Sequence, residues 1–140
     1  LREIEVVMDL QPDLPSVMAD SNRLEQVFIN LLINARDAIE AKWGGNVEQK
    51  AKAKKIFLKT HAKNGRAVVE IADTGTGIPP GIIDKIFEPF FTTKQVGKGT
   101  GLGLSISYGI IQDYDGVIRV KSREEEGSRF IIEFPVSSEN

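Results

Sequence analysis

An aspartate at the end of an apolar strand pattern is the first residue whose type and position could do chemistry. Asp73 ends the strand-like segment Arg66–Asp73 and is followed by Thr74-Gly75-Thr76-Gly77-Ile78. An ionised carboxylate only accepts hydrogen bonds, so at a pocket mouth it suits the exocyclic amino group of a base. Glycines beside it would let a ligand approach the backbone closely. The alternative is a tight turn with a solvated aspartate.

Two asparagines one helical turn apart are the second candidate. Apolar residues recur between Leu24 and Ile39 at the spacing of an amphipathic helix. At about 100° per residue, Asn34 lies at the edge of the apolar stripe and Asn30 about 40° beyond it. Amides in this position could line a pocket, and an amide oxygen suits a hard cation such as Mg²⁺. The alternative is a pair of surface or capping asparagines.

A glycine-rich segment, Gly97–Ser105, runs directly into a predicted helix. Backbone N–H groups at a helix N-terminus bind phosphate, and glycine lets the chain wrap around it. The spacing fits neither a Walker A loop nor a dinucleotide fingerprint, so a phosphate site here needs another architecture. The alternative is a flexible glycine hinge.

Three phenylalanines precede this glycine-rich segment, within Phe87–Lys94. They could latch a lid by burying ~1.5–3 kcal/mol each, although core packing is the commoner fate of phenylalanine. Because Phe91–Gly101 has few apolar anchors and many glycines, we expect it to be mobile when no ligand is bound.

The elements that must position these residues are strands and helices in mixed order. Asn64-Gly65 is a strong hairpin signal between two of the strands. We expect strands at 4–10, 17–19, 55–62, 66–73, 117–122 and 129–136, and helices from about 22 to Trp43, at 82–87 and at 102–114. This order predicts a two-layer α+β sandwich rather than a doubly wound parallel sheet.

The composition narrows the classes of function. The chain has 140 residues, with 18 basic and 20 acidic side chains and a net charge of −2, which argues against binding to nucleic acid or to an anionic membrane. It has no cysteines, which excludes disulfides, thiolate zinc sites and cysteine nucleophiles. No apolar run approaches the ~20 residues that span a bilayer and no signal-peptide pattern is present, so we expect a cytoplasmic location.

The order and spacing of the motifs resemble the ATP-binding catalytic domain of bacterial sensor histidine kinases, in the superfamily of gyrase, chaperone and mismatch-repair ATPases. Asn30–Ala38 is similar to the N box of that family, Asp73–Ile78 to its G1 box, Phe87–Phe90 to its F box and Gly99–Leu104 to its G2 box. Glu126–Phe130 resembles the entry to its last strand. The resemblance covers residues 1–140 as one domain. It implies a mixed, largely antiparallel sheet covered by helices on one face, and the first residue, Leu1, suggests a piece of a longer protein.

The resemblance also implies a role for each matching residue. Asp73 would receive the adenine amino group, Asn34 would bind Mg²⁺, and Phe87 and Phe90 would anchor the lid. Ser128 would make a water-mediated contact near Asp73. The other ATP-binding positions are Asn30, Gly75, Gly77, Ile78, Lys94, Lys98, Gly99, Thr100, Gly101, Leu102 and Gly103.

One position separates the relatives from one another. In the gyrase-like and chaperone-like ATPases, a glutamate one turn before the Mg²⁺-binding asparagine activates water, whereas here that position is Asn30. Because an amide is not a general base, efficient hydrolysis is not expected. The resemblance therefore implies phosphoryl transfer from Mg-ATP to a histidine on a separate helical dimerisation domain, with no catalytic residue and no phosphoacceptor in this chain. His61 is expected to be an exposed histidine at a strand end.

The implied partners are that helical phosphotransfer domain and a response regulator receiver domain, with no nucleic acid and no direct membrane contact. The parent could be a membrane-bound sensor whose cytoplasmic part includes this chain. Two alternatives stay open, namely an ATPase that drives conformational change and a nucleotide-binding module without catalysis. A serine-directed kinase of the anti-sigma type is a minor option.

Overall fold

A long helix supports one face of the protein. The computed structural model describes residues 4–44, 53–89, 91 and 103–137. Helix α1 (Ser21–Trp43) begins where the Asp20 carboxylate accepts the N–H of Asn22 at 2.8 Å, as an N-cap does. Four residues at successive i, i+4 positions are buried on it, namely Val27, Leu31, Ala35 and Ile39. The helix predicted from the apolar spacing is therefore confirmed.

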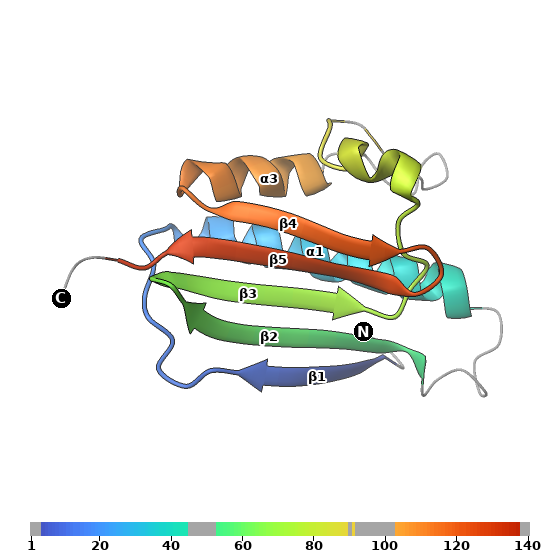
Figure 1. The fold of residues 1–140 in the computed structure, drawn as a ribbon, viewed down its shortest axis with the longest axis horizontal. Helices are drawn as coiled ribbons and strands as arrows, with labels where there is room; N and C mark the ends of the chain where they lie inside the picture. Colours follow the sequence, from blue (N-terminus) through green and yellow to red (C-terminus); the bar gives the residue numbers. More distant parts are fainter. Residues whose placement is uncertain (1–3, 45–52, 90, 92–102, 138–140) are drawn as a thin grey trace.

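Five strands form one mixed sheet. In the order in which they lie side by side they are β1 (Glu5–Leu10), β2 (Lys55–Lys63), β3 (Arg66–Asp73), β5 (Gly127–Pro135) and β4 (Val117–Arg123). β1 runs parallel to β2, and the other neighbours are antiparallel. Figure 1 shows this order across the sheet. The prediction of a mixed, largely antiparallel sheet is confirmed.

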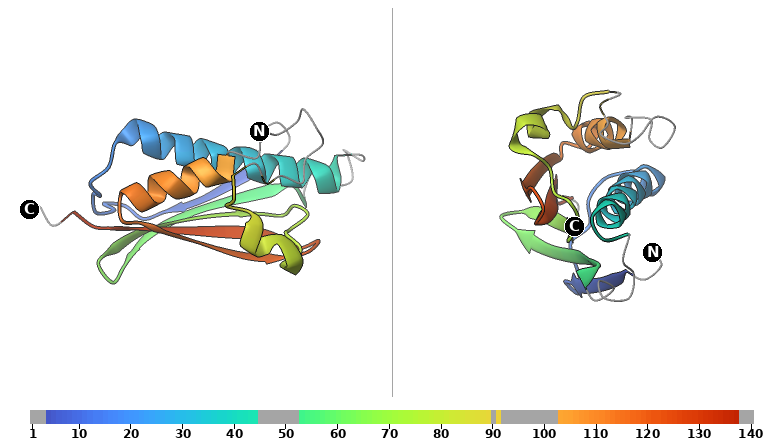
Figure 2. Two further views of the ribbon diagram at one scale, coloured as in Figure 1. Left: turned by 90° about the horizontal axis from the view of Figure 1, so that it is seen from above. Right: turned by 90° about the vertical axis from the view of Figure 1, so that its right-hand side faces the viewer.

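Both long helices cover the same face of this sheet. Helix α3 (Gly103–Asp113) lies beside α1 on that face, as both views in Figure 2 show. Ile110 and Ile111 of α3 share one buried cluster with Ile56, Ile71 and Ile132 of the sheet. A short 3₁₀ helix, η2 (Pro80–Lys85), lies where a helical turn was predicted. The result is the two-layer α+β sandwich expected from the sequence.

The β2–β3 hairpin turns through the two residues that predicted it. Asn64 and Gly65 have φ angles of 52° and 75°, and Lys63 pairs with Arg66 on either side of them. Two successive positive φ angles define the turn that matches the natural twist of paired strands.

The predicted strand at residues 17–19 is wrong. Residues 17–19 are described by the structure and form neither a strand nor a helix. They belong to an irregular segment that leads from β1 to α1. That segment crosses from the edge of the sheet to its helical face, so no strand runs alongside it. The segment is joined to the chain just after β5 by a hydrogen bond of 2.8 Å from the Ser137 N–H to the Ser16 carbonyl.

Candidate functional site

Asp73 is a buried carboxylate at the end of β3. Only 8% of the residue is exposed, and its Oδ1 accepts the N–H of Gly75 at 2.8 Å. Burial raises the pKa of Asp73 to about 6, while hydrogen bonds from the backbone N–H groups of Gly75 and Ser128 act in the opposite direction. At pH 7 the carboxylate is therefore mainly ionised, and it acts as a buried hydrogen-bond acceptor.

The glycines after Asp73 lie close against the protein's own backbone. A Cβ added at Gly75 would lie 2.5 Å from the Ala38 carbonyl carbon, and one at Gly77 would lie 1.9 Å from the Arg123 carbonyl oxygen. Gly77 also has a φ of +72°. These glycines let the G1 segment, Asp73–Ile78, pack against α1 and the end of β4. The protein's own backbone therefore comes close to both glycines, and the approach of a ligand to them stays a prediction.

Thr74 and Trp43 fasten the G1 segment, and sequence reasoning gave neither of them a role. The Trp43 indole Nε1 donates to the Thr74 carbonyl at 2.8 Å. The Thr74 hydroxyl donates to the Ala53 carbonyl at 2.6 Å and accepts the N–H of Lys55 at 3.0 Å. The end of α1 and the start of β2 therefore hold this segment from two sides.

A single stripe of α1 connects the G1 segment with the start of α3. Asn30, Asn34 and Ala38 lie at i, i+4 and i+8, so they follow one another along the helix surface. At one end, the Asn30 Nδ2 donates to the Gly103 carbonyl and to the Ser107 Oγ, both at 3.2 Å. At the other end, the Thr76 N–H donates to the Ala38 carbonyl at 3.2 Å. The half-buried Asn34 lies midway on a stripe about 12 Å long.

Of the predicted phosphate segment, Gly97–Ser105, the structure describes only the last three residues, Gly103–Ser105. Gly103 begins α3, and its carbonyl accepts a hydrogen bond from the Asn30 amide. Most of the predicted lid at 91–101 lies outside the described residues. The predicted ATP-binding positions that also lie outside them are Phe90, Lys94, Lys98, Gly99, Thr100, Gly101 and Leu102.

Phe87 is anchored between helix and sheet. Its ring stacks on Tyr108 of α3 with centroids 5.3 Å apart and meets Phe130 of β5 edge-on at 6.5 Å. Both arrangements are favourable for aromatic pairs. The residue predicted to anchor a lid is thus half-buried and packs against the core, just after η2.

Ile78 and Ser128 meet at a second serine that the sequence did not single out. The Ile78 N–H donates to the Ser122 Oγ at 2.7 Å, and the Ser122 and Ser128 hydroxyl oxygens are 2.9 Å apart. Ser128 is 7% exposed and is the cross-strand partner of Asp73. The side chain of Ile78 packs against the hydrophobic core. The predicted positions Asp73, Ile78 and Ser128 therefore form one cluster, which Ser122 completes.

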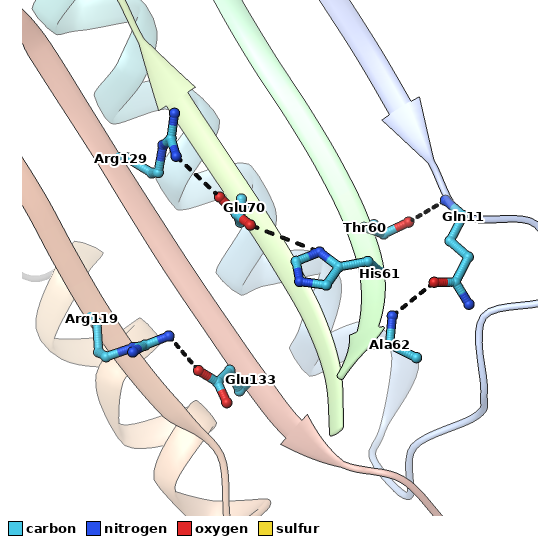
Figure 3. Close-up of polar contacts among 8 residues, drawn as sticks. All are labelled: Gln11, Thr60, His61, Ala62, Glu70, Arg119, Arg129 and Glu133. Carbon is cyan, nitrogen blue, oxygen red and sulfur yellow. Dashed lines mark hydrogen bonds and ion pairs between the residues drawn. The ribbon is translucent and has the colours of Figure 1, made fainter. Parts of the chain in front are cut away.

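His61 lies on the other face of the sheet, away from this cluster. Its Nδ1 is 3.8 Å from the Glu70 Oε2, and Glu70 is also 3.6 Å from the Arg129 Nη1 (Figure 3). The expected exposed histidine is half-buried instead, with 29% of its side chain exposed, because Glu70 and the neighbouring strand flank it. Its place near the end of β2 is as predicted.

A surface hollow of about 740 Å³ lies between the start of α1 and the end of α3, and none of the predicted site residues lines it. Two of the three aspartates that line it already have structural partners. Asp20 caps α1, and Asp113 pairs with Arg23 at 2.7 Å. We therefore place the candidate site at the Asp73 cluster and along the Asn30–Ala38 stripe, not in this hollow.

Comparisons with known proteins show which family this chain resembles. Residues 19–138 match the family model described as histidine kinase-, DNA gyrase B- and HSP90-like ATPase. The sensor kinase CckA of Brucella abortus is 45% identical over 96% of this chain, and the sensor histidine kinase ZraS of Salmonella typhimurium is 38% identical over 96%. The chain spans 15% and 26% of the lengths of these two relatives.

Solved structures give the same family. The nucleotide-free catalytic domain of the histidine kinase ThkA superposes with a TM-score of 0.75 at 36% identity, covering 96% of this chain and 80% of that one. Full-length ShkA in complex with AMPPNP superposes with a TM-score of 0.76 at 29% identity, covering 97% of this chain and 27% of that one.

The chain belongs to the histidine kinase-, gyrase- and HSP90-like ATPase family, and it corresponds to the ATPase domain of sensor histidine kinases. The family and fold predicted from the four boxes are confirmed. Within the described residues, no helix combines the length and apolar character that a membrane span requires.

Proposed function

We propose that this domain binds ATP together with Mg²⁺ and donates the γ-phosphoryl group to a histidine on a separate helical dimerisation domain. The parent would be a sensor kinase of a two-component system, and a response regulator receiver domain would take the phosphoryl group next. The observation that carries the proposal is the α1 stripe, which puts Asn34 between the segment that holds Asp73 and the start of α3.

Adenine recognition is assigned to the Asp73 cluster. A buried acceptor that water hardly reaches discriminates well between bases. A base without a donor at the matching position would leave the acceptor without a hydrogen bond. The adenine amino group supplies that donor. Ile78 and the packed glycines Gly75 and Gly77 would shape the walls of the base site.

The donor set suits magnesium bound largely through substrate. No cluster of three or more His, Cys, Asp or Glu side chains that could hold a metal ion exists among the described residues, so this part of the chain offers no metal cage of its own. Mg²⁺ in nucleotide sites normally keeps several waters and binds phosphate oxygens with only one or two protein ligands. The Asn34 amide oxygen would be such a ligand. When bound, the ion would neutralise charge on the phosphates.

Asn30 favours transfer to an external nucleophile over hydrolysis. Its amide donates to Gly103 and Ser107 and thereby joins α1 to α3. An amide takes no proton from water at neutral pH, so the position gives no general base. A hydrolytic ATPase that drives conformational change is therefore the second candidate, and a binding module without catalysis is the third.

The phosphoacceptor is proposed to come from outside the chain. His61 pairs with Val68 on β3, and alternation along that strand places Val68 and Asp73 on opposite faces of the sheet. His61 therefore cannot reach a phosphate bound beside Asn34. The isolated domain is expected to bind ATP without phosphorylating itself, in the cytoplasm and without direct contact with a membrane or nucleic acid.

Calorimetric titration with ATP, with and without Mg²⁺, tests the first half of the proposal. Addition of a helical histidine domain from a sensor kinase and detection of acid-labile phosphohistidine tests the second half. Transfer that requires both proteins supports the kinase function. ADP release without an acceptor would support the hydrolytic candidate, and binding without transfer to the native partner would support the binding module.

A further inference from the structure

The Ser122 hydroxyl has three hydrogen-bonding neighbours. Its Oγ lies 2.7 Å from the Ile78 nitrogen, 3.1 Å from the Gly127 carbonyl oxygen and 2.9 Å from the Ser128 Oγ. Ile78 and Ser122 are 44 positions apart in the chain. This hydroxyl therefore joins the G1 segment to both strands of the β4–β5 hairpin.

The three neighbours determine where the hydroxyl protons point. A serine hydroxyl has one proton to donate and two lone pairs to accept with. The Ile78 N–H must donate, and the Gly127 carbonyl must accept. The Ser122 hydroxyl therefore donates its proton to the Gly127 carbonyl, and the Ser128 hydroxyl donates to the Ser122 oxygen. This is the arrangement that makes all three bonds at once.

The same arrangement shapes the side of the site next to Asp73. Asp73, Ser128 and Ser122 are cross-strand partners on β3, β5 and β4, so their side chains lie in one row on the helical face of the sheet. Because the Ser128 proton is committed to Ser122, the Ser128 oxygen offers only lone pairs to its surroundings. The ionised Asp73 carboxylate likewise offers only lone pairs.

We infer that Ser122 is a positioning residue that turns the Ser128 proton away from Asp73, so that the base site presents acceptors alone and selects adenine over guanine. Adenine offers an amino group at the position where guanine has a carbonyl oxygen. A site made only of acceptors attracts the amino group, directly or through water, and repels the carbonyl. This inference rests on the proposed ATP-binding function and deepens it by naming what sets base selectivity.

The experiment compares Ser122→Ala, Ser122→Thr and Ser128→Ala with the unchanged domain. Affinities for ATP, GTP and inorganic triphosphate are measured in the presence of Mg²⁺. We expect Ser122→Ala to weaken ATP binding about tenfold and to narrow the ATP-to-GTP preference, because the freed Ser128 proton can then face the base. Triphosphate affinity should not change, and Ser122→Thr should restore the preference because it keeps the hydroxyl.

Ser128→Ala provides the second test, since it keeps the Ile78–Ser122 bond. It should weaken ATP binding without improving GTP binding. An unchanged preference in Ser122→Ala, or an equal loss of ATP, GTP and triphosphate binding, would overturn the inference and leave Ser122 a purely structural residue. If the unchanged domain itself fails to bind ATP, the proposed function fails, and the inference fails with it.

Discussion

The indole Nε1 of Trp43 donates a hydrogen bond of 2.8 Å to the carbonyl of Thr74, the residue directly after the buried Asp73. The bond joins the last residue of α1 to the G1 segment. The end of a long helix thereby holds the backbone that positions the proposed adenine acceptor.

Replacing Trp43 by phenylalanine should loosen this segment. Trp43→Phe keeps an aromatic ring but removes the N–H, which should cost about 1 kcal/mol of unfolding free energy and lower Tm by roughly 2–8 °C. ATP affinity should also fall, because the segment that positions Asp73 is held less firmly. Thermal unfolding and calorimetry give the two values. Tyr108→Phe, which removes only an exposed hydrogen bond with Gln112, is the control and should change Tm little.

Asp73→Asn should remove most adenine affinity at pH 7, because an amide cannot present two acceptor oxygens to an amino group. Adenosine is the suitable probe, since it lacks phosphates that titrate in the same range. Affinity of the unchanged domain for adenosine should weaken as the pH falls through about 6, where the Asp73 carboxylate gains a proton. An adenosine affinity that is level from pH 5 to pH 8 would contradict the assignment.

Asp73 should also make the empty fold less stable at neutral pH. Burial raises the pKa of Asp73 from its usual 3.8 to about 6, so between those values the folded chain holds a proton that the unfolded chain has lost. Its contribution to the free energy of unfolding therefore falls as the pH rises through this window, by up to about 3 kcal/mol. Denaturant unfolding at pH 4 and pH 7 should show Asp73→Asn gaining stability relative to the unchanged domain only at pH 7.

Asn34→Ala should separate metal binding from base binding. We expect the enhancement of ATP affinity by Mg²⁺ to shrink by about tenfold, while adenosine affinity stays unchanged because Asp73 is untouched. Titrations of both ligands at several Mg²⁺ concentrations provide the measurement. Equal losses for ATP and adenosine would show that Asn34 does not act through the metal.

Two glycines with nearly the same backbone angle offer a matched pair. Gly77 and Gly65 have φ angles of +72° and +75°, but a Cβ at Gly77 would lie 1.9 Å from the Arg123 carbonyl oxygen, whereas one at Gly65 meets nothing within 4 Å. Gly65→Ala should cost about 1–2 kcal/mol for the backbone angle alone. Gly77→Ala should cost at least 1–3 kcal/mol more from the clash. Similar losses in the two variants would mean that the G1 segment does not pack as described.

The features that the sequence predicted well are those set by neighbours in the chain. The spacing from Val27 to Ile39 predicted α1, and Asn64-Gly65 predicted the hairpin, because both depend on local backbone preference and on burial of one face. The four boxes and their order identified the family. The resemblance, with Glu126–Phe130 added to the boxes, also assigned Asp73, Asn34 and Ser128 to the candidate site, and their roles stay predictions.

The features that the sequence missed depend on contacts between distant segments. Ser122 meets Ile78 across 44 positions, and Trp43 meets Thr74 across 31, so neither bond leaves a periodic trace in the sequence. The sequence assigned Gly75 and Gly77 to ligand approach, and it did not show that they also make room for Ala38 and Arg123. A run of glycines shows that something comes close, but not what.

The alignment of three residues along α1 limits where the length of such a domain can change. Because Asn30, Asn34 and Ala38 share one stripe, the helical repeat fixes both the distances between them and the direction in which each side chain points. Inserting a single residue between Asn34 and Ala38 would rotate one end against the other by about 100° and aim the amide at the sheet or the solvent. Insertions and deletions outside α1 should therefore be tolerated. A one-residue change in the spacing between Asn30, Asn34 and Ala38 should not be tolerated.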